Sequence, residues 1–347
     1  MEKRISEKSE FINVMKLFLL LGVVLLHCNP GSSPASQGAD STAMAITEYI
    51  TRMLNACPSC FFIISGYLFF RNIKGRFNAH SYGNKLRRRV RTLLVPYLAW
   101  NTICAALLIV KAGYLGFPGS GIVSDGNVDW LRLLEGFWMV EGNKPYPLAF
   151  AFWFIRNLMV FMLLSPAVWL IARNRWTTCI FFIVYIVTDF NFHGLQWFVL
   201  GSSLALCGLE LPQTDSRRGI LFAAAALLSG CFLNIPMPEP AARALLLVFT
   251  ISVWFALSAP ARAIATHPSR KTFKILLQAN FFIYAFHQCF CTLTVTACLR
   301  VFGTHTFAEV MTAYIMSFVA LTGISTVVYL LIKRTLPAMT GMLTGGR

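Results

Sequence analysis

The stretch Phe11–Cys28 reads FINVMKLFLLLGVVLLHC and decides the fold class of this chain. It is long enough and apolar enough to cross a bilayer as a helix. It also holds two ionisable side chains, Lys16 near one end and His27 near the other, and both are costly inside a membrane. Such groups usually face the protein interior and serve an ion path, a substrate or a cofactor. The stretch therefore predicts a transmembrane helix with a functional face.

Lys16 and His27 are predicted to share that face. They are eleven positions apart, and at about 100° and 1.5 Å per residue this step brings the two side chains nearly into line, about 16 Å apart along the axis. The alternative is structural. In that interpretation Lys16 extends its ammonium group to the membrane surface, and His27 only caps the outer end of the helix.

The composition of the whole chain extends the membrane prediction beyond this helix. Of 347 residues, 56% are hydrophobic and 13% charged, and the mean hydropathy is +0.63. These values are typical of an all-α, polytopic membrane protein. We predict about ten transmembrane helices, at residues 11–28, 48–70, 92–116, 149–171, 176–190, 193–209, 217–234, 241–258, 274–300 and 307–332. The fifth and sixth are short and also fit a tight hairpin that stops before the far surface.

The distribution of charge predicts the orientation. The formal net charge is +16, from 30 basic and 14 acidic residues. With both termini in the cytoplasm, 22 of the 30 Lys and Arg residues lie on the cytoplasmic side and four in the outer loops. This is the positive-inside pattern, so the charge indicates contact with membrane lipids and no nucleic-acid partner. We expect residues 1–347 to form a single membrane domain without an appended soluble domain.

Five short motifs occur in order along the predicted spans: Lys16-x10-His27, Phe61–Tyr67 (FFIISGY), Arg87–Tyr97 (RRRVRTLLVPY), Trp153–Arg156 (WFIR) and Phe281–His287 (FFIYAFH). Each motif alone is weak, but together and in this order they resemble the membrane-bound acyltransferase 3 family. That family usually has arginine where Lys16 stands, and often an acidic residue where this chain has Asn13. The positive charge is kept here, whereas a planar, bidentate grip on phosphate or carboxylate is lost.

The resemblance implies an enzyme of the cell membrane, in bacteria the inner membrane. It implies transfer of an acyl group, most often acetyl, from cytoplasmic acyl-coenzyme A to a hydroxyl of a glycan or lipid-linked sugar on the far side, without a metal. Such transfer needs a base for the hydroxyl proton and positive charge for the donor. We predict His27 as that base or as a transient acyl acceptor, two roles that the residues do not distinguish. Lys16 is predicted to lie where the donor enters.

Four arginines at the cytoplasmic mouth of the third span are predicted to bind the phosphates of coenzyme A through charge-assisted hydrogen bonds. They are Arg87, Arg88, Arg89 and Arg91. A cationic run at this place is also typical of an anchor that touches anionic lipid, so anchoring is the alternative.

Six further residues are predicted to support the site. Arg52 and Arg156 hold the acceptor or pair with carboxylates, for which the candidates are Glu48, Glu135, Glu141 and Asp189. His287 orients the acyl carrier, bonds to Tyr67 or Ser65, or makes an ordinary interhelical bond. Ser65 and Gly66 permit close helix approach or a kink, and Ser65 lacks the surroundings of a nucleophile. Trp153 completes the set of substrate or support residues.

Two other interpretations stay open at this point. Cys57-Pro-Ser-Cys60 has CxxC spacing but no second ligand pair, which argues against a metal site, and an outer disulfide that involves Cys28, Cys57 or Cys60 is possible.

The competing function is a transporter of polysaccharide or acyl groups, because buried Lys, His and Arg also suit a proton relay. Consumption of the thioester distinguishes the two functions.

Overall fold

The computed structural model describes residues 2–73, 78–115, 121–124, 127–140, 146–188, 192–233, 235–266 and 273–346. Within these ranges nearly all regular structure is helical, and the one sheet is a small antiparallel ribbon of β1 (Val123–Ser124) and β2 (Asn127–Val128). The predicted all-α class is therefore confirmed.

The helices vary widely in length, and their bounds are α1 Glu2–His27, α2 Ser41–Leu54, α3 Ala56–Phe70, α4 Ala79–Arg89, α5 Val95–Leu115, α6 Trp130–Glu135, α7 Trp153–Leu163, α8 Ser165–Ala172, α9 Arg175–Val187, α10 Leu195–Leu206, α11 Ser216–Phe232, α12 Glu239–Thr266, α13 Lys274–Phe302, α14 Phe307–Thr335 and α15 Pro337–Thr344. A π-helical turn, Val90–Leu94, joins α4 to α5. Short 3-10 helices lie at Pro30–Ser32, Pro34–Ser36 and Phe150–Phe152.

Six helical segments of the described residues are long and apolar enough to cross a membrane, and they lie at Ser9–His27, Ser41–Phe70, Tyr82–Gly113, Glu239–Thr266, Lys274–Phe302 and Phe307–Thr335. A bent pair, Phe150–Leu163 with Ser165–Ala172, makes seven if it counts as one span. The chain is thus a multi-pass membrane protein. The other three predicted spans fall on α9, α10 and α11, which are shorter than the roughly 20 residues that a membrane helix needs. The number ten and the cytoplasmic termini stay predictions.

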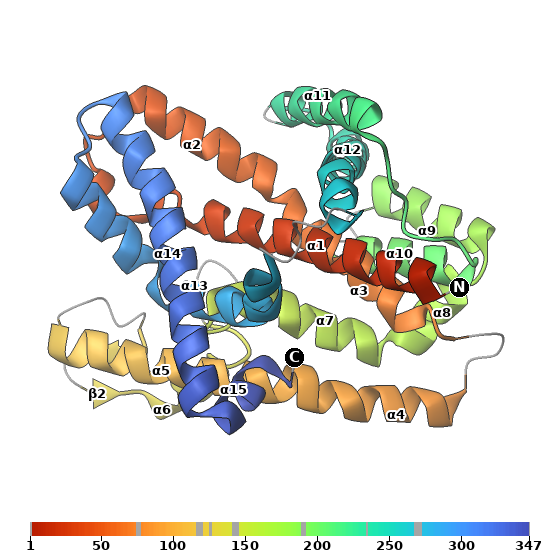
Figure 1. Cartoon of the computed structure of the whole chain (residues 1–347), viewed down its shortest axis with the longest axis horizontal. Helices are drawn as coiled ribbons and strands as arrows, with labels where there is room; N and C mark the ends of the chain where they lie inside the picture. Colours follow the sequence, from red (N-terminus) through yellow and green to blue (C-terminus); the bar gives the residue numbers. More distant parts are fainter. Residues whose placement is uncertain are drawn as a thin grey trace.

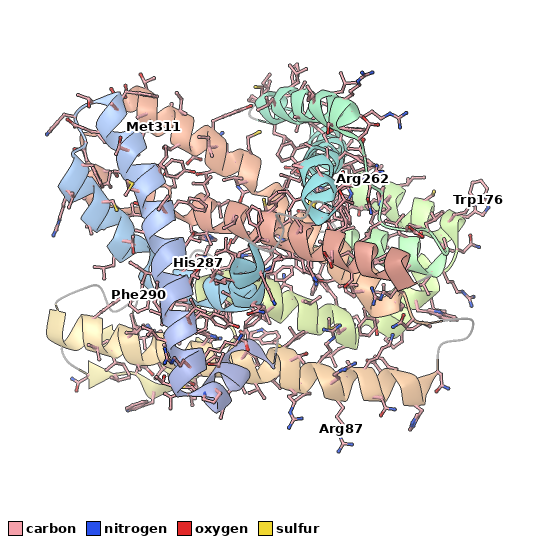
Figure 2. The ribbon with its side chains drawn as sticks, in the orientation of Figure 1. Arg87, Trp176, Arg262, His287, Phe290 and Met311 are labelled. Carbon is pink, nitrogen blue, oxygen red and sulfur yellow. The ribbon has the colours of Figure 1, made fainter. Side chains whose placement is uncertain are left out.

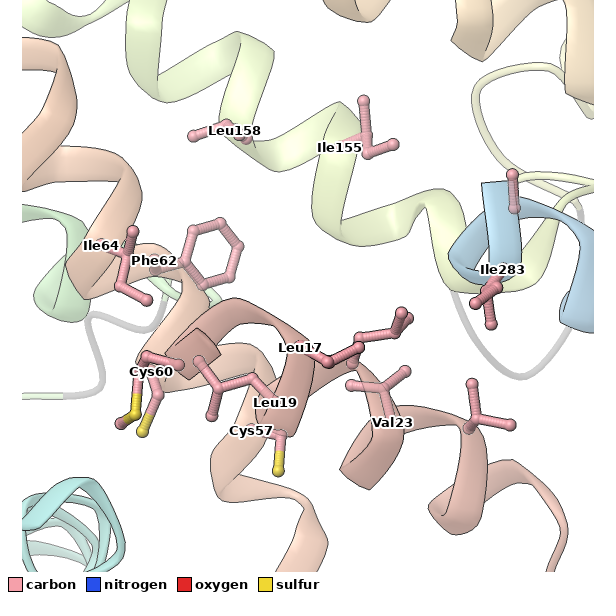
Figure 3. Close-up of a cluster of buried hydrophobic side chains, with 14 of the residues drawn as sticks. Leu17, Leu19, Val23, Cys57, Cys60, Phe62, Ile64, Ile155, Leu158 and Ile283 are labelled. Atoms are coloured by element: carbon pink, nitrogen blue, oxygen red, sulfur yellow. The ribbon is translucent and has the colours of Figure 1, made fainter. Parts of the chain in front are cut away.

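Helix α1 crosses the middle of the molecule (Figure 1). It contacts α2, α3, α12, α13 and α14. Its apolar side chains, among them Met15, Leu17, Leu19, Leu20 and Val24, are buried in the main core. Figure 3 shows Leu17 and Val23 of α1 between side chains of α3, α7 and α13. A helix with neighbours on most sides is apolar on most faces, which explains why its few polar side chains stand out in the sequence.

Helices α3 and α10 approach each other closely at two glycines. A Cβ atom on Gly66 would overlap the carbonyl oxygen of Phe198, and one on Gly201 would overlap the carbonyl oxygen of Ile63. Both positions therefore need glycine, because no larger residue fits between the backbones. This confirms the close helix approach predicted at Ser65-Gly66.

The cysteines form no disulfide. All ten lie in the described part of the chain and are free thiols, and Cys28, Cys57 and Cys60 are buried. The outer disulfide that the sequence allowed is therefore absent. The sulfur atoms of Cys104 in α5 and Cys289 in α13 lie 3.0 Å apart. Among the described residues, no group of His, Cys, Asp or Glu side chains is arranged to hold a metal ion.

Candidate active site

A cavity of about 1140 Å³ lies beside α1. Most of the rest of its wall comes from α2, α3, α7 and α13, and α4 and the connecting segments contribute further residues such as Arg89 and Phe150. Along α1 its lining runs from Asn13 and Lys16 to His27. Between these polar positions the wall is mainly apolar and aromatic, with Val23, Phe61, Phe154, Ile155 and Leu158 among its residues. Polar side chains from several other segments also line it, among them Asn29, Glu48 and Gln288. A wall that combines apolar surface with polar groups at fixed places is typical of a small-molecule site.

His27 is the last residue of α1, and its own helix fixes its ring. The Nδ1 atom lies 2.7 Å from the carbonyl oxygen of Val23. A carbonyl oxygen can only accept, so Nδ1 carries the hydrogen, and in the neutral ring Nε2 keeps its lone pair. The ring also contacts Phe150 edge-on, with 5.6 Å between centroids, and His287, with 5.1 Å. His27 thus presents an oriented imidazole at the cavity.

Lys16 lines the same cavity as His27 and is partly buried. Their eleven-residue separation places them about 16 Å apart along α1. Two other predicted residues, Ser65 of α3 and Trp153 at the start of α7, line the cavity as well. Tyr67 is partly exposed and is not among the described residues that form the wall.

The four predicted arginines occupy different surroundings. Arg89, the last residue of α4, lines the cavity and is partly buried. The other three, although they belong to the described residues, are exposed and do not reach the wall. Figure 2 shows Arg87 pointing outward from the body of the protein. Only one of the four therefore lies on the cavity wall, because a helix turns successive side chains in different directions. Binding of coenzyme A phosphates by Arg87, Arg88, Arg89 and Arg91 at the cytoplasmic mouth stays a prediction.

Arg156 is buried, but its guanidinium group fixes a loop. Its Nη1 donates to the carbonyl oxygen of Trp138 at 2.7 Å, and the guanidinium also lies over the Trp138 ring, 5.4 Å from its centroid. Its Nε and Nη2 donate to Oδ1 of Asn157. Arg156 does not line the cavity as the described residues define it. Two of its predicted partners, Glu141 and Asp189, lie outside the described residues.

Arg52 pairs with Glu48, one of the partners that the sequence suggested. The Nε atom lies 3.1 Å from Oε1 of Glu48, and both side chains are about half exposed (50% and 52%). Such a pair contributes only about 0–1 kcal/mol to stability. Glu48 itself lines the cavity and accepts a hydrogen bond from Asn29, which also donates to Thr51. Arg52 is thus connected to the cavity through its ion pair with Glu48.

His287 is fully buried, 0% exposed, behind the ring of His27. Its Nδ1 donates to the carbonyl oxygen of Ile283 at 3.2 Å, and its Nε2 finds no hydrogen-bond partner in the described chain. The bonds to Tyr67 or Ser65 that the sequence suggested are therefore replaced by a bond within its own helix. The reason is proximity, since the carbonyl oxygen four residues earlier lies next to the ring.

Residues 9–334 match the sequence profile of an acyltransferase domain, the acyltransferase 3 profile. The chain belongs to the acyltransferase 3 family. This confirms the resemblance seen in the motifs. The chain is also similar to the succinoglycan biosynthesis protein ExoH of Rhizobium meliloti (strain 1021), with 30% identity over 184 residues. That match covers 51% of this chain and 46% of the relative, so the chain spans about half the length of this relative. No solved structure is significantly similar to this chain.

Three residues at this acyltransferase-family cavity, Phe150, Tyr284 and Gln288, were not identified as site residues from the sequence. Phe150 contacts His27, and Tyr146 contacts Phe150 with 4.3 Å between ring centroids. The 3-10 turn that carries Phe150 is held by α13, because Tyr284 donates to the carbonyl oxygen of Ala151 and Gln288 accepts from its amide. Tyr284 and Gln288 are four residues apart, hence on one helix face. The spacing of Tyr284 and Gln288, four positions apart on either side of His287, was the signal in the sequence that these side chains share one helix face.

Proposed function

We propose that this chain is an O-acyltransferase of a bacterial inner membrane. It takes an acyl group, acetyl in the first instance, from cytoplasmic acyl-coenzyme A and passes it to a hydroxyl of a surface polysaccharide or lipid-linked sugar. The observation that carries the proposal is a single cavity lined by both His27 and Lys16. Family membership supports acyl transfer, and a relative named for succinoglycan biosynthesis supports a glycan acceptor.

In this proposal the donor enters at the Lys16 end of the cavity. Coenzyme A is polyanionic. Among the described residues, Lys16 and Arg89 are the Lys and Arg side chains that line the cavity. Cations that are partly withdrawn from water bind phosphate through strong charge-assisted hydrogen bonds. The distance of about 16 Å from Lys16 to His27 along the helix is comparable to an extended pantetheine arm. The thioester can therefore reach His27 while the nucleotide stays at the other end.

His27 acts on the acceptor hydroxyl through Nε2. The hydroxyl proton moves to Nε2 while the hydroxyl oxygen bonds to the thioester carbonyl carbon. The carbon–sulfur bond then breaks, and the departing thiolate takes the proton from His27. The hydrogen bond from Nδ1 to Val23 keeps the ring in the tautomer that this step needs. A transient acyl group on His27 would use the same Nε2 lone pair.

The test is transfer of labelled acetyl from acetyl-coenzyme A to the glycan fraction in isolated membranes. His27→Gln should lower the rate by about 10²- to 10⁴-fold at equal protein abundance, since this is what a general base supplies. His305→Gln is the matched control, because His305 is exposed and is not part of the described cavity wall. Near-normal transfer by His27→Gln would refute the assignment.

The same assay separates the enzyme from a transporter. An acyltransferase consumes the thioester and releases free coenzyme A thiol in step with acyl transfer. A transporter of polysaccharide or acyl groups leaves acetyl-coenzyme A intact in these membranes. Intact thioester in the presence of a competent acceptor would therefore contradict the proposed function.

A further inference from the structure

The carboxamide of Gln288 lines the cavity and carries a donor that the proposed reaction does not yet use. Its Oε1 lies 3.1 Å from the backbone nitrogen of Ala151. A backbone N–H group can only donate, so the amide atom that faces it is the oxygen and not the nitrogen. The NH2 group therefore occupies the other branch of the carboxamide, and among the described residues it has no hydrogen-bond partner.

The residues next to this carboxamide lie against the ring of His27. Ala151, which donates to Oε1, directly follows Phe150, and the Phe150 and His27 ring centroids are 5.6 Å apart. His287, which directly precedes Gln288, lies 5.1 Å from the same ring. His287 is fully buried whereas Gln288 lines the cavity, because successive helix positions point about 100° apart. The NH2 group is thus a donor of the cavity wall near the imidazole of His27.

The position of the carboxamide is fixed by two bonds to one residue. Gln288 accepts from the amide of Ala151, and Tyr284 donates to the carbonyl oxygen of Ala151. The two side chains are one helical turn apart on α13, so together they hold the turn on both sides of Ala151. A donor that is held in this way needs little reorganisation when negative charge develops beside it.

Other polar side chains of the wall use their hydrogens within the protein. The Nδ2 atom of Asn29 donates to Glu48 and Thr51. The hydroxyl group of Ser32 donates to the carbonyl oxygen of Asn29. The NH2 group of Gln288 differs from these groups, because its hydrogens are available to a molecule in the cavity.

We propose that Gln288 is a catalytic residue whose NH2 group donates to the carbonyl oxygen of the acyl-coenzyme A thioester; this rests on the proposed function. When the acceptor hydroxyl oxygen bonds to the carbonyl carbon, the electron pair of the carbonyl double bond moves to its oxygen, which becomes an oxyanion. The NH2 group stabilises this oxyanion until the double bond re-forms and the carbon–sulfur bond breaks. The hydroxyl proton passes to His27 and then to the departing thiolate, so Gln288 neither gains nor loses a proton.

This contact raises the rate because it strengthens as charge develops. A thioester carbonyl oxygen is a weak acceptor, whereas an oxyanion is charged, and hydrogen bonds to charged groups are stronger. An interaction that is stronger in the transition state than in the ground state raises kcat. Removal of one donor to an oxyanion typically lowers kcat by about 10²- to 10³-fold.

The test compares Gln288→Glu with Gln288→Met in the acetyl-transfer assay. Glu has the shape of Gln, and one of its carboxylate oxygens still accepts from Ala151, but the second oxygen replaces the donor. We expect Gln288→Glu to lower kcat per folded molecule by about 10²- to 10³-fold, with KM unchanged for both substrates and a nearly unchanged unfolding temperature. Rates are compared at the pH optimum of each variant, because the new carboxylate also acts on His27.

Gln288→Met keeps the length of the side chain and loses both hydrogen bonds. It should lower kcat at least as much and also lower the unfolding temperature, because the amide of Ala151 is left unpaired. Gln213→Glu is the matched control, since Gln213 is exposed and is not part of the described cavity wall. It should change neither kcat nor the unfolding temperature.

A role in holding the turn alone predicts a different result. A carboxylate accepts the hydrogen bond from Ala151 at least as well as an amide oxygen does. Gln288→Glu would then stay active, and only Gln288→Met would lose activity. A role in binding the sugar predicts a higher KM for the sugar with an unchanged kcat. Either result would overturn the assignment of Gln288 to the oxyanion.

The outcomes also separate this inference from the proposed function. Absence of acyl transfer in the wild-type protein would overturn both. Transfer by the wild type together with near-wild-type kcat in Gln288→Glu would overturn this inference alone. If the carboxylate prevents folding, Gln288→Met decides, since a folded Met variant with near-wild-type kcat would also overturn it.

Discussion

Two arginines of one helix illustrate how much a single side chain's direction matters here. Arg89 and Arg87 both belong to α4, yet Arg89 lines the cavity and Arg87 points outward (Figure 2). A cation that is partly withdrawn from water interacts more strongly with phosphate than one in bulk solvent, because the local dielectric is lower. The site is therefore expected to use Arg89, and the exposed arginines to face lipid headgroups or water.

This difference gives a prediction for the donor. Arg89→Gln should raise KM for acetyl-coenzyme A about tenfold or more, since a charge-assisted hydrogen bond to phosphate is lost, and should leave KM for the sugar unchanged. Arg87→Gln is the control in the same helix and should change neither constant. Initial rates over a range of both substrates measure this. A similar rise in both KM values, or a larger effect of Arg87→Gln, would contradict donor binding at Arg89.

At the scale of helices, the contact between α3 and α10 depends on two residues without side chains. Gly66 and Gly201 let the backbones meet, so α3 can present Ser65 to the cavity from one side while α10 supports it from the other. Extra volume in a packed contact costs about 1–3 kcal/mol, because the helices must move apart. The shape of the cavity therefore depends on a contact outside it.

Gly66→Ala should consequently lower the temperature of unfolding in detergent, with a loss of about 1–3 kcal/mol in stability. Gly323→Ala in α14 is the matched control, since the space around that glycine is open within 4 Å as far as the described atoms show. Alanine favours helix over glycine, so this control should be neutral or slightly stabilising. Equal melting temperatures for the two variants would contradict the close packing of α3 on α10.

The helices differ in how well the sequence predicted them. Long apolar runs such as Phe11–Cys28 predicted their helices well, because hydropathy alone sets whether a segment can cross a bilayer. The run at 149–171 is apolar enough to be predicted as one straight span. In the structure it is broken at Leu164, and the two helical parts meet at an angle of 73°. Pro166 at the start of α8 explains the break, since proline cannot donate to the preceding turn.

Contacts between distant helices were beyond sequence reasoning. Lys16 and His27 were placed correctly on one cavity because a single helix fixes their spacing. The contact of His287 with His27 joins helices far apart in the chain, and the bond of Arg156 to Trp138 joins α7 to a loop 18 positions earlier. Periodicity within one helix does not specify which helix lies opposite, so these partners needed the three-dimensional structure.

For the whole molecule, Cys104 and Cys289 provide a check on the packing of α5 against α13. Their sulfurs lie 3.0 Å apart although 185 positions separate them in the chain. A disulfide needs the sulfurs at about 2.0 Å, a small further approach. A mild oxidant, which takes up two protons and two electrons, should therefore join them. Counting thiols with a mass-tagged maleimide should show two fewer after oxidation.

Cys104→Ser is the control for that experiment, because it removes one partner and should abolish the oxidation-dependent loss of thiols. Full labelling of both cysteines after oxidation of the wild type would show that α5 and α13 do not pack as described. The test needs no substrate and is independent of any catalytic role.

The π-helical turn Val90–Leu94 has a consequence for how this protein can vary. A π turn holds one more residue than an α turn, and each helical residue advances the side-chain direction by about 100°. Deleting a single codon in this turn would therefore rotate α4 against α5 and carry Arg89 off the cavity. In an alignment of relatives, a gap misplaced here would equate a cavity arginine with a surface one. Substitutions in this turn should therefore disturb the position of Arg89 less than an insertion or a deletion would.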